Sequence, residues 1–282
     1  MCGRTACTLA PENVQKALSY KPKKSSKYVK PEWREASNGG RNYKPSHNVC
    51  PTDITPVLIS GAHFSCESER IIQPMMWGMI PPWHQGDYKS HKLSTNNCRI
   101  ENLDSSKLYK KPFLQGQRCV VVCDGFYEWQ TTKGKDKQPY FIYMPQVNDI
   151  KIEDEKTWST DFNENEGWKG PNLLKMAALF DRWVSPEGEE IYSYSIITLE
   201  SNETLSWLHH RMPAILDSDE LVSSWLDFGH INGSNALELL KGVKLLTWHK
   251  VSTLVNNSRN KDVTCNKPLT EKYSSPMNHQ FQ

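Results

Sequence analysis

The residue with the most distinctive chemistry is Cys2, which follows the initiator methionine and precedes Gly3 and Arg4. If Met1 is removed, Cys2 carries a free α-amine and a thiol on neighbouring carbon atoms. An α-amine has a pKa of roughly 7.7–8.0, so about a quarter of it is neutral at pH 7.4, against about one part in a thousand of a lysine. Only the neutral amine attacks a carbonyl carbon. The thiol can then close a five-membered thiazolidine ring, so the pair predicts reaction with an aldehyde; the alternative is a small second residue without a chemical role.

A second candidate is the segment STNNCRIE at residues 94–101. Asn97, Arg99 and Glu101 alternate, so in an extended segment their side chains share a face. The amide there could orient an amine, and the guanidinium could hold a phosphate. The alternative interpretation is a turn followed by a surface salt bridge.

The segment CVVVCDGFYEW, residues 119–129, places a carboxylate among aromatic side chains. An apolar strand runs into a turn at Asp124 and Gly125, and Glu128 follows. A surrounding of low polarity raises the pKa of a carboxyl group and suits it to moving protons near neutral pH. The alternative is a half-exposed glutamate paired with a lysine.

Two adjacent histidines stand in LHHRMPAIL, residues 208–216. We expect His209 and His210 to point in different directions, so they do not share a metal ion. One of them could titrate in a useful range while the other packs. Arg211 is a candidate phosphate ligand, and the alternative for each histidine is a purely structural role.

The segment PMMWGMIPPW, residues 74–83, combines a rigid turn with aromatic side chains. Gly78 and the prolines shape the turn, and Trp77 and Trp83 lie on either side of it. A tryptophan exposed beside a cleft can stack on a nucleic-acid base. Packing in the core is the alternative for both.

Charge is unevenly distributed along the 282 residues, although the net charge is only +2. Residues 16–34 hold seven Lys or Arg against one acid, and this stretch either faces a phosphate backbone or is a solvated loop. Residues 149–166 hold seven acids against two lysines. We therefore expect an acidic surface insertion at about 146–170, and its composition predicts disorder.

Eight cysteines are present, and none of them forms a CxxC pair, so the sequence predicts no metal site. The N-terminus has no apolar run, so we expect neither a secretion signal nor a membrane helix. Reduced thiols in the cytosol or nucleus follow from this expectation.

The elements that must position these residues are mainly strands. Apolar and β-branched runs broken by Gly, Pro and Asp predict strands, and two patterns of helical period follow late in the chain. Without a βαβ rhythm, this order indicates an α+β domain with a mixed, mostly antiparallel, barrel-like sheet flanked by short helices. The domain is expected over residues 2–266, followed by a disordered tail at 267–282. The predicted strands are residues 55–60, 70–80, 118–129, 138–144, 173–184, 191–200 and 244–255, and the predicted helices are residues 9–20, 218–228 and 234–242.

Together these stretches resemble the SRAP family, named for "SOS response-associated peptidase". The resemblance covers roughly residues 2–260. It rests on MCGR at the start, WG..PPW, N-x-R-x-E, DGFYEW and H-x-R-M-P, in that order, with a weaker VSTLVNNSRN at residues 251–260.

The resemblance implies a single SRAP domain that acts on abasic sites. Cys2 would be the catalytic residue, linking through a thiazolidine to the ring-opened aldehyde of an abasic site in single-stranded DNA and shielding the lesion during replication. Asn97 would position the α-amine, Glu128 would move protons, and His209 would assist opening of the deoxyribose ring. No metal or organic cofactor is implied.

The resemblance also implies how the DNA is held. Arg4, Arg99 and Arg211 would bind flanking phosphates, and Trp83 would stack on a base. The expected partner is single-stranded DNA with abasic sites, including sites near replication junctions. The protein would act as a monomer and would not associate with a membrane. Its expected location is the nucleus, at replication forks, with the cytoplasm as a second location.

Two positions depart from the family pattern. Met76 stands where relatives usually have an arginine, so one phosphate contact is missing or supplied elsewhere. The end of the chain, PMNHQFQ, contains no clamp-binding motif.

Two other functions stay open from the sequence. One is a cysteine protease or autoprotease in which His209 activates the Cys2 thiolate, with Glu128 or Asn97 orienting it. The other is a non-covalent reader of modified DNA bases, whose binding would survive the loss of Cys2.

Overall fold

The centre of the fold is a closed ring of five strands. A computed structural model of the chain describes residues 2–131 and 137–269. The ring runs β13–β12–β7–β4–β5 through antiparallel pairings, and a parallel pairing of β5 with β13 closes it. The short strands β14, β2 and β6 extend its edges. The bounds are β2 (Glu32–Trp33), β4 (Ile54–Ser60), β5 (Arg70–Trp77), β6 (Asn97–Arg99), β7 (Arg118–Cys123), β12 (Leu174–Val184), β13 (Glu190–Glu200) and β14 (Arg211–Pro213).

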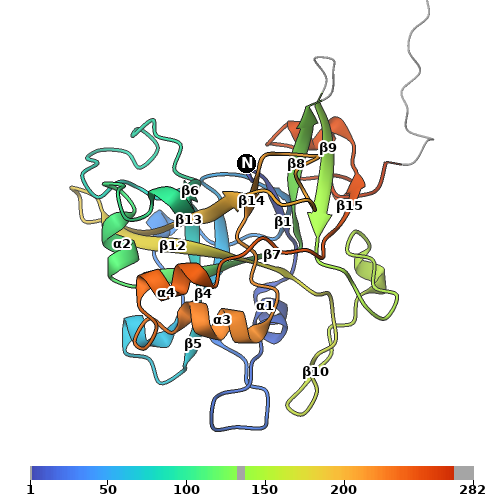
Figure 1. Cartoon of the computed structure of the whole chain (residues 1–282), viewed down its shortest axis with the longest axis horizontal. Coiled ribbons are helices and arrows are strands. Elements are labelled where there is room, and N and C mark those ends of the chain that lie inside the picture. The colour runs from blue at the N-terminus through green and yellow to red at the C-terminus, as the bar shows by residue number, and fades with distance from the viewer. Residues whose placement is uncertain (1, 132–136, 270–282) are drawn as a thin grey trace, which may run out of the picture.

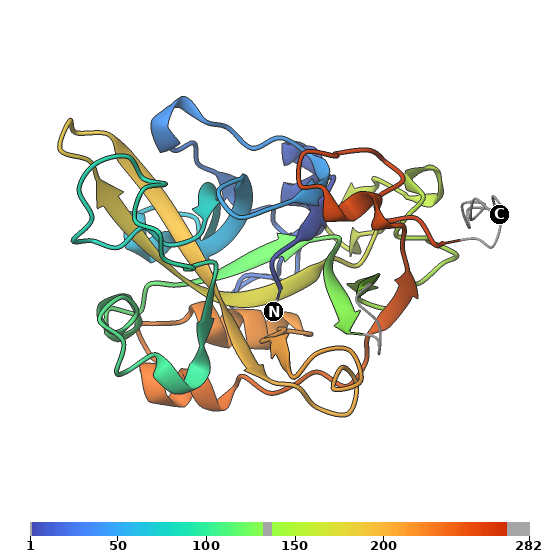
Figure 2. The same cartoon turned by 90° about the horizontal axis from the view of Figure 1, so that it is seen from above.

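The ring strands are buried on both faces, which explains their nearly continuous apolar sequences. Every residue of β5 and β7 is buried. Helices α2 (Lys110–Leu114), α3 (Asp219–Leu226) and α4 (Gly233–Glu238) lie together on one side of the ring (Figures 1 and 2). Trp225 of α3 is fully buried, and its indole N–H donates to the Cys119 carbonyl at 2.9 Å. The predicted α+β fold with a mixed barrel is confirmed.

A second sheet carries the N-terminus. Its order is β15–β9–β8–β1–β3, with bounds β1 (Thr5–Cys7), β3 (Ser46–Val49), β8 (Gly125–Thr131), β9 (Lys137–Tyr143) and β15 (Thr247–Lys250). Strand β1 lies between β3 and β8 and pairs with both of them in antiparallel fashion. The N-terminal segment is thereby tied into the interior of a sheet, and Figure 2 shows it near the middle of one face of the molecule.

Asp124 alone separates β7 from β8, so the chain passes there from the ring to the second sheet. The Asp124 backbone N–H donates to the Ala6 carbonyl at 2.8 Å. Its carboxylate Oδ2 accepts from the backbone N–H of Thr8 at 3.1 Å and from the Thr8 hydroxyl at 2.8 Å. This corner therefore fixes β1 at its C-terminal end. Burial raises the pKa of Asp124 to about 7, although the Thr8 hydrogen bonds act in the opposite direction.

The acidic segment is folded, so the expectation of disorder was wrong. It contains η4 (Glu155–Thr157) and a hairpin of β10 (Phe162–Asn163) and β11 (Gly167–Trp168). Apolar residues among the acids anchor it, since Ile152 is buried and the Trp158 indole donates to the Lys151 carbonyl at 2.8 Å.

The remaining elements are short. They are α1 (Pro11–Ala17) and the 3₁₀ turns η1 (Asn38–Gly40), η2 (Gly61–Phe64), η3 (Ile100–Asn102) and η5 (Thr253–Asn256). All eight cysteines are free thiols. Within residues 2–131 and 137–269, no helix has the length and apolar character needed to cross a membrane. Pro268 forms a β-bridge with Val251, and residues 270–282 of the predicted tail lie outside the described residues.

Gly125 allows close packing where β8 begins. A Cβ atom at this position would lie 2.5 Å from the Ile142 carbonyl oxygen and 2.6 Å from the Phe141 ring. Gly125→Ala should lower the free energy of unfolding by about 2–3 kcal/mol, because backbone and a packed ring must shift. Gly229→Ala is the control, since nothing lies within 4 Å of its added Cβ and a change within about 0.5 kcal/mol is expected. Urea unfolding measures both, and equal effects would contradict the packing argument.

The raised pKa of Asp124 predicts a pH dependence of stability. Between about pH 4 and pH 7 the folded state keeps a proton that the unfolded chain has lost, so stability falls as pH rises. At 1.36 kcal/mol per pKa unit, the loss is on the order of 4 kcal/mol relative to Asp124→Asn, which cannot ionise. Denaturant unfolding of both proteins across this range measures the difference. Parallel stability curves would show that Asp124 titrates normally.

Candidate active site at the N-terminus

The main chain of Cys2 is held by two amides from the segment preceding and starting β6. The Nδ2 group of Asn97 donates to the Cys2 carbonyl at 2.7 Å, and that of Asn96 donates to the same oxygen at 3.3 Å. Asn97 is itself fixed by the pairing of β6 with β13. Its Oδ1 atom is buried and has no hydrogen-bond partner among the described residues. An acceptor is thus available beside Cys2 for an N–H donor.

The Cys2 side chain lies in the core, with a relative exposure of 1%. Burial raises the pKa of its thiol far above the ordinary value, and the negative charge of Glu128 raises it further. Glu128 belongs to β8, is 6% exposed, and accepts the Trp129 backbone N–H at 3.1 Å. A carboxylate from the second sheet therefore acts electrostatically on the Cys2 sulfur.

His209 is the second side chain, after Cys2, on which the Glu128 carboxylate acts. Burial lowers the pKa of the imidazole, and the nearby Glu128 charge only partly offsets this. The Nδ1 atom accepts the Arg211 backbone N–H at 3.0 Å. The Arg211 carbonyl lies 3.2 Å from the same atom, and when Nδ1 accepts the Arg211 N–H the proton of the neutral ring is on Nε2. Burial thus favours a neutral imidazole close to Glu128 at pH 7.

The two histidines do not point in different directions as expected. Their ring centroids lie 4.4 Å apart with an interplanar angle of 25°, so the rings stack. The reason is local: His209 and His210 occupy a loop before β14, where side chains do not alternate as they do in a strand. Among the described residues, no group of three or more His, Cys, Asp or Glu could hold a metal ion.

The Arg4 side chain is bound by β3 and η5 of the protein itself. Its guanidinium donates to Asn48 Oδ1 at 2.9 Å and to the Val255 carbonyl at 2.6 Å, and it lies 5.7 Å from the Trp129 ring centroid. Asn48 donates in turn to the carbonyls of Asn257 and Asn260. The VSTLVNNSRN segment is therefore a loop fastened beside β1. Sequence reasoning missed the role of Asn48.

Arg99 and Arg211 differ in their surroundings. The Arg211 guanidinium is nearly buried and forms a bidentate pair with Glu101, at 2.7 and 2.9 Å, and it also donates to the Thr198 carbonyl. This pair lowers the pKa of Glu101. Arg99 is exposed at the end of β6. Arg99 is thus open to a ligand, whereas Arg211 already has an anionic partner.

The two tryptophans divide as one core and one surface residue. Trp83 is 55% exposed, whereas Trp77 is fully buried and its indole donates to the Asn96 carbonyl at 3.0 Å. Trp77 thereby positions Asn96, a residue that the sequence analysis missed although it adjoins Asn97.

At Met76, the Arg41 guanidinium lies 3.4 Å from the sulfur, so a cation stands beside this neutral side chain.

Comparison with known proteins agrees with these motifs. Residues 1–258 match the family described as SOS response associated peptidase (SRAP). Over 270 residues the chain is 46% identical to "Abasic site processing protein HMCES" of Xenopus tropicalis, covering 94% of this chain and 77% of that protein. It is 30% identical over 220 residues to "Abasic site processing protein YoqW" of Bacillus subtilis, covering 77% and 84%.

Solved structures share the fold at low identity. A crystal structure of a Bordetella bronchiseptica protein matches with a TM-score of 0.63 and 18% identity, covering 89% of this chain and all of that one. One from Bacteroides thetaiotaomicron matches with a TM-score of 0.61 and 22% identity, covering 80% and 86%. Together with the family match across nearly the whole described chain, these findings establish that the chain belongs to the SRAP family.

Proposed function

We propose that this chain processes abasic sites by forming a covalent crosslink between Cys2 and the aldehyde of an abasic site in single-stranded DNA. One observation carries the proposal. Cys2, which holds an amine and a thiol after Met1 removal, has its carbonyl bound by the Asn97 amide. The charge of Glu128 acts to raise the pKa of both the Cys2 thiol and the His209 imidazole. The names of the relatives as abasic site processing proteins support the same substrate.

The first step is capture of the aldehyde by nitrogen. The Cys2 α-amine adds to the aldehyde carbon, and loss of water gives an imine. The buried Oδ1 of Asn97 accepts an N–H of the amine and so directs its lone pair toward the substrate. Glu128 takes the proton released by nitrogen and returns one to the departing hydroxyl.

The second step is ring closure by sulfur. The thiol adds to the imine carbon, its proton reaches the ring nitrogen through Glu128, and a thiazolidine forms. The net change is the loss of one water with no oxidation or reduction. A thiol with a raised pKa stays protonated until Glu128 accepts its proton, which favours attack by nitrogen first.

The aldehyde must first be released from the closed sugar. His209 is mainly neutral because burial lowers its pKa, and its Nδ1 atom is occupied by the Arg211 N–H. We assign Nε2 to the proton transfer that opens the deoxyribose ring. Glu128, acting on the same imidazole, stabilises the charged form when it appears.

The DNA-binding residues have two kinds of role. Arg99, which is exposed, binds a flanking phosphate, and Trp83 stacks on a base. Arg4 and Arg211 also attract the phosphates through their positive charge. Their existing hydrogen bonds, to the Val255 carbonyl and to Glu101, hold the segments around the site in place as well. Shielding of lesions at replication forks in the nucleus would follow from such a crosslink.

A cysteine protease needs a thiolate, whereas burial and Glu128 both raise the pKa of the Cys2 thiol. The crosslinking reaction also requires the amine, which a thiol protease does not use. The state of the chain terminus therefore discriminates between the two functions.

The crosslink predicts a defined mass. The protein lacking Met1, incubated with a single-stranded oligonucleotide carrying one abasic site, should gain the mass of the DNA minus one water. One extra residue ahead of Cys2 should abolish the product, and Cys2→Ser should give an imine that only a hydride reductant traps. Intact-mass spectrometry and denaturing gels measure these outcomes. A stable adduct from unreduced Cys2→Ser would refute ring closure.

Glu128→Gln separates the proton-transfer role from a structural one. Adduct formation should slow by about 10²–10⁴-fold, the range for loss of a general acid–base group. The pKa of the Cys2 thiol should fall, because the negative charge that raises it is gone. Single-turnover gels and the pH dependence of thiol alkylation measure the two effects. Glu238→Gln, at an exposed site on α4, is the control. An unchanged pKa of the Cys2 thiol in Glu128→Gln would contradict the electrostatic effect of Glu128 on Cys2.

A further inference from the structure

Two adjoining grooves beside the site are lined by cations. One, of about 370 Å³, includes Arg41 and Lys44, and the other, of about 270 Å³, includes Lys89 and Lys92. Thr52 lines both, so they are contiguous. We call this combined feature, defined by Arg41, Lys44, Thr52, Lys89, Lys92 and Asn96, the Arg41 groove. Because Asn96 also donates to the Cys2 carbonyl, the groove reaches the wall of the active site.

Arg41 is held in a fixed orientation. Its Nε donates to the Asn38 carbonyl and its Nη1 to the Thr52 carbonyl, each at 3.1 Å. The guanidinium also lies 4.1 Å from the centroid of the Tyr88 ring. A guanidinium whose position is fixed by neutral groups keeps its full charge for an anionic ligand and loses little entropy when it binds one.

The positive charge of the groove is not balanced by the protein. Within the described part of the chain, none of the four cations forms an ion pair with a carboxylate. The carboxylate that lines the groove, Asp53, is paired with Lys261 at 3.0 Å. By contrast, Arg70 and Arg211 each have a carboxylate partner. Clustered, unpaired cations on one surface are the electrostatic signature of a phosphate-binding surface.

The groove also lies on the correct face. Figure 2 shows the loop that includes η1 and the loop between β5 and β6 on the same side of the N-terminus, toward the upper left of the view. Arg41 and Lys44 follow η1, and Lys89 and Lys92 belong to the second loop. The two loops meet where the Arg41 guanidinium lies over the Tyr88 ring, so their cations form one surface.

From this geometry we infer that the Arg41 groove binds the sugar–phosphate backbone of the single-stranded DNA that flanks the lesion, with one phosphate on the Arg41 guanidinium. The inference rests on the proposed function and adds the path of the substrate to it. Lys89 and Lys92 contact neighbouring phosphates as exposed point charges.

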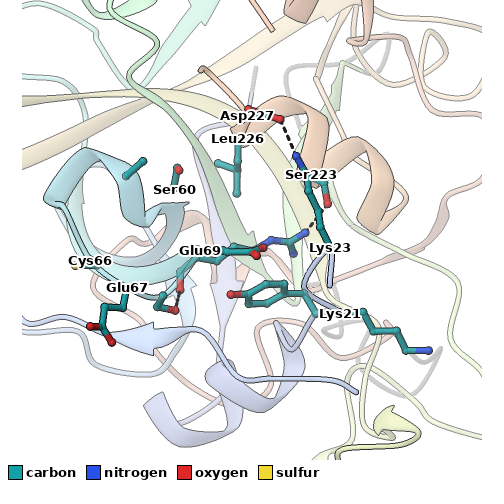
Figure 3. Close-up of a pocket in the computed structure, with 13 residues that line it drawn as sticks. Lys21, Lys23, Ser60, Cys66, Glu67, Glu69, Ser223, Leu226 and Asp227 are labelled. Atoms are coloured by element: carbon teal, nitrogen blue, oxygen red, sulfur yellow. Dashed lines mark hydrogen bonds and ion pairs between the residues drawn. The ribbon is translucent and has the colours of Figure 1, made fainter. Parts of the chain in front are cut away.

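The basic stretch at residues 16–34 is the competing surface. Figure 1 shows the loop between α1 and β2 at the end of the molecule opposite the N-terminus. Two of its lysines are paired with acids, Lys23 with Asp227 at 3.3 Å and Lys27 with Glu164 at 3.0 Å. Figure 3 shows the pocket beside this loop, with Lys23 turned toward Asp227. Its charge is partly neutralised and it lies far from Cys2, so we expect no direct role in binding the substrate.

Binding to an intact, lesion-free oligonucleotide tests the inference without any covalent step. The double variant Lys89→Glu/Lys92→Glu is compared with Lys21→Glu/Lys24→Glu, which makes the same charge change on the competing loop. Fluorescence anisotropy with a labelled single strand at several salt concentrations gives the affinity and its salt dependence. The groove variant should bind at least tenfold more weakly at about 0.1 M salt, and its salt slope should decrease by about 0.7 for each phosphate that the variant no longer binds.

Arg41→Ala should also weaken binding several-fold and lower the salt slope by about 0.7. Because Arg41 supports two loops, its unfolding curve is measured as well, and the lysine variants decide the matter if Arg41→Ala is unfolded. Equal weakening by the groove and loop variants, or greater weakening by the loop variant, overturns the inference. The wild-type protein is tested in parallel with the abasic oligonucleotide. Absence of its adduct contradicts the proposed function, whereas unchanged affinity of the groove variants contradicts the groove alone.

Discussion

A reactive group at the end of a chain must be held still, because the first residues of most domains are poorly ordered unless something ties them down. Here the constraint is met by β1, which pairs on both sides within a sheet, and by the Asn97 amide on the Cys2 carbonyl. Cys2 is thus held both through β1, which follows it in the chain, and by β6, which belongs to a distant part of the sequence. In the proposed reaction, the groups that move protons act on the Cys2 amine and thiol, so these two groups must be held at a defined position.

The closed ring and the second sheet supply the residues around Cys2 from independent directions. Asn97 comes from β6 at the ring edge, and Glu128 comes from β8 of the sheet that also holds β1. Asp124 joins the two units, and its carboxyl group is buried with Oδ1 unpartnered among the described residues. An ionised carboxylate at this buried position lowers the free energy of unfolding. The corner that fixes β1 is therefore less stable than the same turn with a neutral side chain would be.

The sequence predicted most of the strand content, because strands depend on local patterns, and it named several residues that the structure brings together around Cys2. Cys2, Asn97, Glu128 and His209 were candidates by residue type, each with a structural alternative, and the family resemblance implied their roles. The apolar runs predicted the ring strands. Closure of the ring depends on the parallel pairing of β5 with β13, which joins distant segments and which no local period encodes. The stacking of the two histidines, the loop fastened to Arg4 and the neighbourhood of Arg41 depend equally on the tertiary fold, so no local pattern predicts them.

The arginines show why residue type alone does not assign a role. Arg211 is paired in bidentate fashion with Glu101, so a phosphate that binds it must replace a carboxylate of similar charge and geometry. Such an exchange gains little free energy, because one charge-assisted pair is broken for each one formed. Arg99 and Arg41 have no carboxylate to give up among the described residues, so a phosphate adds a pair without breaking one. In the proposed function, affinity for the DNA backbone therefore depends mainly on the unpaired cations, whereas the main chain of Arg211 contacts His209 and pairs β14 with β13.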